Sequence, residues 1–183
     1  DRVILLSDRA FAGADTLATS YTLTMAINRM GAESPVDVIL CGKQAIDGDT
    51  AQTGPGIATR MKITQLTYVT EILWVRPEEK AIQVRRKVDT GTEVLRGSLP
   101  ALLTVELELA KPRRAALPAM IHALSAHIDV WDSEAISAVK NMIGIKGSPT
   151  WVRKISSPSP REGGPRYHAD ADPQQAVCQL VDA

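Results

Sequence analysis

The sequence contains little cysteine and few aromatic residues, and it has no excess of either charge. Two cysteines in 183 residues, far apart in the chain, exclude a disulfide-stapled secreted domain and give no CxxC spacing. Lys and Arg total 21 and Asp and Glu total 21, so the formal net charge is zero. Binding to nucleic acid needs clustered excess cations, which this balance disfavours. We expect a reduced, cytoplasmic-type compartment.

Long apolar runs are also absent, so no segment is expected to span a bilayer. No Ser–His–Asp constellation and no metal-ligand spacing is visible, which makes a stand-alone hydrolase the least favoured enzyme class. The basic runs at 85–87 and 111–114 are either local anion-binding patches or simply a charged strand end and a charged loop.

The first forty residues alternate strand, helix and strand. Residues 3–6 are an apolar run typical of a buried strand, and residues 36–40 form a second one. Between them, Asp15 is placed to cap a helix whose apolar face carries Leu23, Ala26, Ile27 and Met30, with Gly31 as its stop. This alternation predicts an α/β fold with a mostly parallel sheet and crossover helices.

The middle of the chain is rich in strand formers. Residues 67–75 and 81–88 predict a hairpin, followed by a short strand at 94–95 and a long one at 99–109. We interpret residues 67–109 as a layer added to the α/β core. Three elements follow: a helix at 119–127, a strand at 128–131, and a helix capped by Ser133 and stopped by Gly144. Residues 1–147 then form one domain, and 148–183 form an extended arm, rich in Pro, Gly and Ser to residue 165, with a closing helix at 173–181.

Two polar stretches carry the candidate chemistry, and each begins where a predicted strand ends. In residues 7–20, hydroxyl-bearing side chains open a helix, which favours either anion binding or ordinary capping. In residues 41–54, glycines permit close approach of a ligand, and Asp47 or Asp49 could accept from a ribose hydroxyl or an adenine amine. This second stretch matches neither the Walker pattern nor GxGxxG, so a turn-rich connection is its alternative. Pro55 is expected to begin a short helix that ends at Met61.

These stretches resemble a known family. Residues 38–55, Val-Ile-Leu-Cys-Gly-Lys-Gln-Ala-Ile-Asp-Gly-Asp-Thr-Ala-Gln-Thr-Gly-Pro, are similar to the adenine-nucleotide loop of electron transfer flavoprotein β subunits. Residues 109–120, Leu-Ala-Lys-Pro-Arg-Arg-Ala-Ala-Leu-Pro-Ala-Met, look like the family's partner-recognition loop, here expected over about 109–127. The family's opening strands and helices have no counterpart in this sequence. We therefore expect an N-terminally short member, with Asp1 just before the family's third strand.

The resemblance implies an adenine nucleotide α-hydrolase-like fold and an α subunit as partner, which carries the electron-shuttling FAD. It also implies that a nucleotide is held by one continuous loop, whose residues are Gly42, Lys43, Gln44, Ala45, Ile46, Asp47, Gly48, Asp49, Thr50, Ala51, Gln52 and Thr53. Leu117 matches the exposed leucine that the family inserts into a pocket of its acyl-CoA dehydrogenase partner. Its neighbours Arg113, Arg114, Pro118 and Met120 are assigned to the same surface. The alternative for Leu117 is a side chain folded onto the local core.

Ordinary members hold AMP in the β subunit, whereas a second branch holds another FAD there and performs electron bifurcation. Residues 5–20 resemble that branch, which implies that five residues of the first stretch help to hold the FAD diphosphate: Asp15, Thr16, Ala18, Thr19 and Ser20. The leading hypothesis is a bifurcating β subunit, which passes electrons from NADH to an acyl-CoA dehydrogenase and to ferredoxin or flavodoxin. The alternatives are a non-bifurcating subunit with structural AMP and an adenine-nucleotide-binding module without electron transfer. No catalytic residue is assigned.

Overall fold

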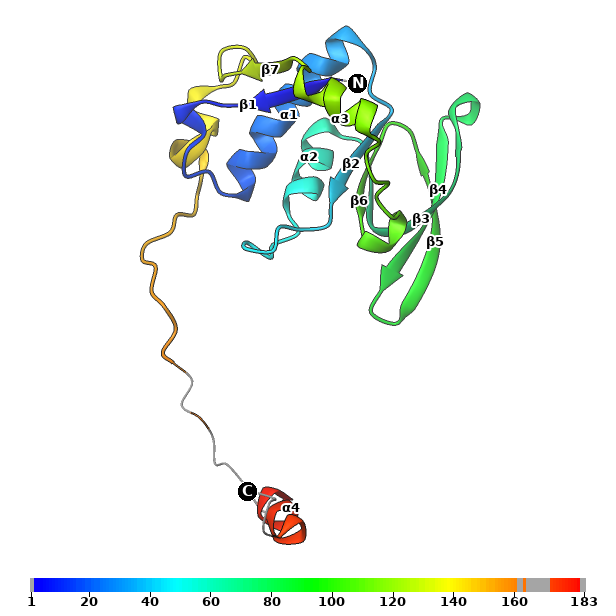
Figure 1. Cartoon of the computed structure of the whole chain (residues 1–183). Coiled ribbons are helices and arrows are strands. Elements are labelled where there is room, and N and C mark those ends of the chain that lie inside the picture. Colours follow the sequence, from blue (N-terminus) through cyan, green and yellow to red (C-terminus); the bar gives the residue numbers. More distant parts are fainter. Residues whose placement is uncertain (1, 161–162, 164–171, 182–183) are drawn as a thin grey trace. The chain divides into compact units, whose positions relative to one another are not determined.

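The computed structural model describes residues 2–160, 163 and 172–181, within two compact units, Asp1–Trp151 and Val152–Ala183 (Figure 1). The second unit contains the helix α4 (Pro173–Val181), where the sequence predicts the closing helix. Of the expected arm, residues 148–160 and 163 form neither helix nor strand, while residues 161, 162, 164 and 165 lie outside the described residues. No helix in the described part of the chain has the length and apolar character needed to cross a membrane.

The strands of the first unit form two sheets. One is a parallel pair, β1 (Val3–Leu6) and β7 (Ile128–Trp131). The other has five strands in the order β2 (Val38–Gly42), β6 (Ala101–Val105), β3 (Thr64–Arg76), β4 (Ala81–Val88) and β5 (Gly91–Ser98). β6 runs parallel to β2 and β3, whereas β4 runs antiparallel to β3 and β5. The predicted α/β class with a mostly parallel sheet is confirmed.

The predicted hairpin is present, but it continues the five-stranded sheet instead of forming an added layer. β3 has 13 residues, and it pairs with β6 from Thr64 to Val69 and with β4 from Val69 to Arg76. One long strand therefore belongs both to the parallel part and to the hairpin. β5 is also longer than the predicted strand at 94–95, because every residue from Gly91 to Ser98 pairs with β4.

Two helices, α1 (Thr16–Glu33) and α2 (Thr53–Met61), lie beside each other next to β2 (Figure 1). The predicted apolar face of α1 is confirmed, and it divides between two clusters. Ala26 and Met30 pack with β1 and β7, whereas Leu23 and Ile27 pack with β2, β6 and α2. α1 continues two residues beyond the predicted stop at Gly31, since a single glycine weakens a helix without ending it. The helix ends at its C-cap residue Ser34, which is extended, because the following Pro35 disfavours helical geometry in the residue before it.

α2 begins at Thr53, two residues before the predicted start at Pro55. A proline in the first turn is tolerated, because the N–H that it lacks would have no partner within the helix there. The predicted end at Met61 is confirmed, and Lys62 closes the helix in the left-handed conformation, with φ of 56°.

The predicted helix after Ser133 is wrong. Ser133 does not cap a helix: its N–H and hydroxyl both donate to the carboxylate of Asp8 at the end of β1. Ser137 then adopts a positive φ of 52°, which an α-helix cannot include. Only short 3-10 turns follow, at Lys140–Met142 and Gly144–Gly147.

Two further boundaries differ from prediction. β6 occupies only Ala101–Val105 of the strand predicted at 99–109, since Pro100 has no N–H to donate and the chain turns into a 3-10 segment at Leu107–Leu109. The helix predicted at 119–127 is α3 (Leu117–Leu124). Leu117 therefore begins this helix instead of lying in the loop before it.

Candidate functional site

The two polar stretches singled out in the sequence meet in the fold. Residues 7–15 lead from the end of β1 to the start of α1, and residues 43–52 lead from the end of β2 to the start of α2. The side chains of Thr16 and Gln52 join them, since the Thr16 hydroxyl donates to Oε1 of Gln52 at 2.8 Å. The starts of two helices thus lie next to each other at the carboxyl ends of parallel strands, which is where α/β sheets bind ligands.

Close helix packing fixes this arrangement one turn further on. A Cβ added to Gly56 of α2 would lie 2.8 Å from Cβ of Ser20 in α1, so only glycine fits there. Ser20 is buried, and its hydroxyl donates to the carbonyl of Leu17 at 2.9 Å. Ala18 is buried as well. These two predicted site residues therefore belong to the packed base of the site, while Thr16 and the half-buried Thr19 lie nearer its surface.

Asp15 organises the start of α1. One carboxylate oxygen accepts from the N–H groups of Leu17 and Ala18, at 2.9 and 3.0 Å. The other accepts from the N–H and the hydroxyl of Thr150, at 3.2 and 2.8 Å. Desolvation raises the pKa of Asp15, but the hydrogen bonds from Ala18, Thr150 and Leu17 together outweigh it and lower the pKa. A charged, fully engaged carboxylate therefore occupies this helix start.

The start of α2 is built differently. Gln52 is its N-cap residue but makes no side-chain hydrogen bond to the helix, so the first N–H groups, at Thr53 and Gly54, have no side-chain cap. A Cβ on Gly54 would lie 2.6 Å from Cγ2 of Thr104, which shows how tightly this end packs on β6. Uncapped N–H groups at a helix start attract anions. The start of α2 is therefore the stronger of the two candidate phosphate sites.

The loop before α2 is exposed and shaped by unusual backbone angles. Asp49 and Ala51 have positive φ values of 48° and 53°, which folds the chain back on itself. The N–H of Asp49 donates to the carbonyl of Ala45 at 2.9 Å, and the amide of Gln44 donates to the Asp49 carboxylate. The remaining predicted loop residues are exposed at the tip of the loop: Ile46, Asp47, Gly48 and Thr50.

Lys43 was predicted to belong to the nucleotide loop, but its side chain lies apart from the other loop residues. Its ammonium lies 3.2 Å from the Glu106 carboxylate and 5.4 Å from the centre of the Tyr68 ring. Together with Arg86 and Lys87 these residues line a separate hollow of about 640 Å³ beside the hairpin. Gly42, at the end of β2, leaves open space where a Cβ would project.

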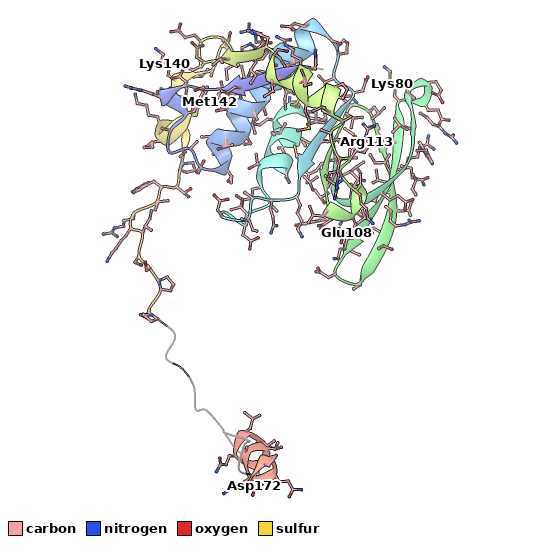
Figure 2. The ribbon with its side chains drawn as sticks, viewed as in Figure 1. Lys80, Glu108, Arg113, Lys140, Met142 and Asp172 are labelled. Atoms are coloured by element: carbon pink, nitrogen blue, oxygen red, sulfur yellow. The ribbon has the colours of Figure 1, made fainter. Side chains whose placement is uncertain are left out.

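The predicted partner surface is an exposed helix with an apolar side. Every residue of α3 is exposed, and Leu117, Met120, Ile121 and Leu124 are all at least half accessible to solvent. Leu117 is 68% exposed, so it is not folded onto the local core. Arg113, which is labelled in Figure 2, lies with Arg114 in the extended segment that leads to α3, and Pro118 occupies the first turn of the helix.

Comparison with known proteins decides the family. Residues 1–136 match the electron transfer flavoprotein domain. The chain belongs to the electron transfer flavoprotein family. It is 48% identical over 163 residues to protein FixA of Azotobacter vinelandii, which covers 88% of this chain and 58% of FixA. It is also 40% identical over 184 residues to the electron transfer flavoprotein subunit beta of Megasphaera elsdenii, which covers 99% of this chain and 67% of that subunit.

A third relative of this electron transfer flavoprotein chain is subunit CarD of the caffeyl-CoA reductase-Etf complex from Acetobacterium woodii. The two are 43% identical over 164 residues, which covers 90% of this chain and 60% of CarD. The chain thus spans about three fifths of the length of FixA and of CarD. The similarity to β subunits inferred from the sequence is confirmed.

The structure of this electron transfer flavoprotein domain adds residues that sequence reasoning missed. Arg60 of α2 reaches across to α1, where its guanidinium donates to the carbonyl of Leu17 at 3.2 Å and lies 3.4 Å from the Ser20 hydroxyl. Thr150 and Ser148 hold Asp15 from the far end of the unit. The run Ser148-Pro149-Thr150 is a signal that could have drawn attention to them. Among the described residues no cluster of His, Cys, Asp or Glu could hold a metal ion.

Proposed function

We propose that this chain is the nucleotide-binding part of a bifurcating electron transfer flavoprotein β subunit and that it holds FAD. The observation that carries the proposal is the contact between Thr16 and Gln52, which unites two helix starts in one site. A diphosphate needs two such positions side by side, whereas the single phosphate of AMP needs one. The similarity to CarD, whose name places it in a reductase-Etf complex, supports the same conclusion.

The two helix starts are suited to two different phosphates. At α2 the uncapped N–H groups of Thr53 and Gly54 fit one phosphate, with the helix dipole in favour of the negative charge. At α1 the charged carboxylate of Asp15 already uses the N–H groups of Leu17 and Ala18. A second phosphate there would be held by the hydroxyl of Thr19 and, if it turned from Gln52, by the hydroxyl of Thr16, and not by the backbone.

The loop would hold the rest of the nucleotide. Asp47 at its tip offers a carboxylate to a ribose or adenine donor, and the positive φ at Asp49 and Ala51 lets the backbone curve around a ligand. FAD, when bound, supplies the conversion between two-electron and one-electron transfer. The residues of this chain bind the cofactor and orient it. They also exclude water from the floor of the site, where Ser20 and Gly56 are in close contact.

In this proposal the partners are an α subunit and a dehydrogenase that acts on acyl-CoA thioesters. The apolar side of α3, with Leu117 and Met120 exposed, provides an anchor, and Arg113 and Arg114 provide a basic rim. The assembled complex would take electrons from NADH and deliver them to the acyl-CoA dehydrogenase and to ferredoxin or flavodoxin.

The identity of the bound nucleotide tests the proposal. The complex of the β subunit with its α subunit is denatured, and the released nucleotides are identified and counted by mass spectrometry. Two FAD per heterodimer are expected. One FAD with one AMP would support a non-bifurcating carrier with structural AMP. A chain that binds a nucleotide but associates with no flavin-bearing subunit would support a nucleotide-binding module outside electron transfer.

A single variant separates the two phosphates. Replacing Thr19 by valine removes its hydroxyl but keeps the side-chain shape and the contact between Thr16 and Gln52, so we expect FAD affinity to fall by about tenfold while AMP affinity stays within about twofold. Thr92→Val on β5, an exposed strand position outside the site, is the matched control. Equal losses of FAD and AMP affinity would mean that α1 holds no second phosphate.

A further inference from the structure

A second hollow lies between the segment that follows β1 and the segment that follows β7. Its volume is about 360 Å³, which is within the range of pockets that take small molecules. Ala10 and Ala12 line it from the first segment, and Ser133 and Ile143 line it from the second. Among the described residues, none from α1 or α2 lines it, so it is separate from the two helix starts of the candidate nucleotide site.

Tight packing gives this hollow a rigid frame. Gly144 has a positive φ of 53°, and a Cβ added to it would lie 2.2 Å from the carbonyl oxygen of Ala10. The next residue, Ile145, donates its N–H to the carbonyl of Ala12 at 3.2 Å. A Cβ on Gly13 would lie 2.4 Å from Cγ1 of the same isoleucine. The two segments are therefore locked together around the hollow by backbone contacts that only glycine permits.

Three cations line the hollow without a partner of opposite charge. Arg9 comes from the turn that follows β1, and Lys140 (labelled in Figure 2) and Lys146 come from the two 3-10 turns near the end of the unit. All three are exposed, and in the described part of the chain none of them forms an ion pair. The neighbouring acids Asp132 and Glu134 are exposed and do not line the hollow. Convergent charges of one sign concentrate anions at such a place.

The nearest carboxylate is already engaged by the protein. Asp8 accepts from the N–H of Ala10 at 2.9 Å and from both the N–H and the hydroxyl of Ser133. These hydrogen bonds, with a smaller contribution from the charge of Lys140, lower the pKa of Asp8 to about 2. Asp8 is therefore ionised at neutral pH and offsets one of the three cations. About two positive charges remain for a ligand.

The rest of the lining is apolar and suits the body of an organic anion. Ile143 is buried in the wall, whereas Ile145 is 66% exposed and offers its side chain to whatever fills the hollow. A phosphate monoester carries about two negative charges at neutral pH and three acceptor oxygens. Guanidinium and ammonium groups make strong, charge-assisted hydrogen bonds to such oxygens. The charge and the number of donors both match this group.

We propose that this hollow binds a small phosphate ester, with Arg9, Lys140 and Lys146 around the phosphate and with Ile143 and Ile145 against the apolar body of the ester. The site lies outside the proposed nucleotide site and does not depend on the identity of the nucleotide held there. It gives the chain a second, independent place for a phosphorylated metabolite.

A titration followed by NMR tests the proposal. Phenyl phosphate, which combines a phosphate with an apolar ring, is added to the full chain, and inorganic phosphate is the probe without the ring. We expect shifts at the amides of Ala10, Ala12 and Ile145, and an affinity for phenyl phosphate at least threefold higher than for inorganic phosphate. Shifts confined to Thr53 and Gly54 would place the anion at the start of α2 and overturn the proposal. Equal affinity for the two probes would overturn the assignment to an ester.

Paired lysine variants provide the matched control. Lys140→Gln with Lys146→Gln removes two charges from the hollow, whereas Lys111→Gln with Lys154→Gln removes two exposed charges elsewhere. We expect the first pair to weaken phenyl phosphate binding by about tenfold or more and the second pair to change it by less than about twofold. Arginine at both positions of the first pair should restore most of the affinity. Equal effects of the two pairs, or no binding at millimolar phenyl phosphate, would overturn the proposal.

Discussion

Replacing Gly54 by alanine would place a methyl group between the start of α2 and the sheet. The new Cβ would lie 2.6 Å from Cγ2 of Thr104 and 3.4 Å from Cδ2 of Leu102. Ordinary contact requires a displacement of about 0.8 Å, and overpacking of this kind costs about 1–3 kcal/mol. Alanine improves helix propensity by at most about 1 kcal/mol, which offsets only part of that cost. We expect a net loss of about 1–2 kcal/mol in the free energy of unfolding, measured by urea titration.

The same displacement would move the uncapped N–H groups of α2 and weaken nucleotide binding, by about tenfold if one hydrogen bond to phosphate is lost. Gly31→Ala in α1 is the matched control, because it lies outside the candidate site and the nearest atom to its added Cβ is Cγ2 of Val36 at 4.0 Å. Thr104→Ser removes Cγ2 but keeps the hydroxyl that accepts from the N–H of Tyr68 at 3.1 Å. Added to Gly54→Ala, it should restore most of the stability. Double and single variants of equal stability would refute the argument.

Three further predictions concern pH, thiol reactivity and the exposed helix. Hydrogen bonds from Ala10 and Ser133 lower the pKa of Asp8 to about 2, against 3.8 for a free side chain. The unfolded chain therefore binds more protons between these values, so acid unfolding should steepen as pH falls from 4 to 2, and Asp8→Asn should flatten that slope. Burial raises the pKa of Cys41, whereas Cys178 is exposed. A thiol reagent should therefore label Cys178 at least about tenfold faster than Cys41, and Cys178→Ser should abolish the fast phase of labelling. Leu117→Ala should weaken binding to the acyl-CoA dehydrogenase by about tenfold, measured by calorimetry. The midpoint of thermal unfolding should not change, because the side chain is 68% exposed.

The parts of the fold that the sequence predicted are those in which local pattern and tertiary packing agree. Leu23 and Ile27 recur at helical spacing and do pack on the sheet. The failed helix after Ser133 shows the opposite case. Its apolar residues do pack in the core, since Ile136 and Ile143 are both 2% exposed. The hydroxyl of Ser133, however, donates to the carboxylate of Asp8, 125 residues away, and does not cap a helix. No local pattern contains that partner.

The candidate site divides in the same way. Strand ends followed by glycines and hydroxyls indicated both polar stretches, and the stretches meet because α1 and α2 pack closely against each other. The contact of Thr16 with Gln52 could not be predicted, because it depends on how far α2 extends past Pro55 toward the loop. Arg60 was missed for a similar reason, since its partners Leu17 and Ser20 belong to a different helix.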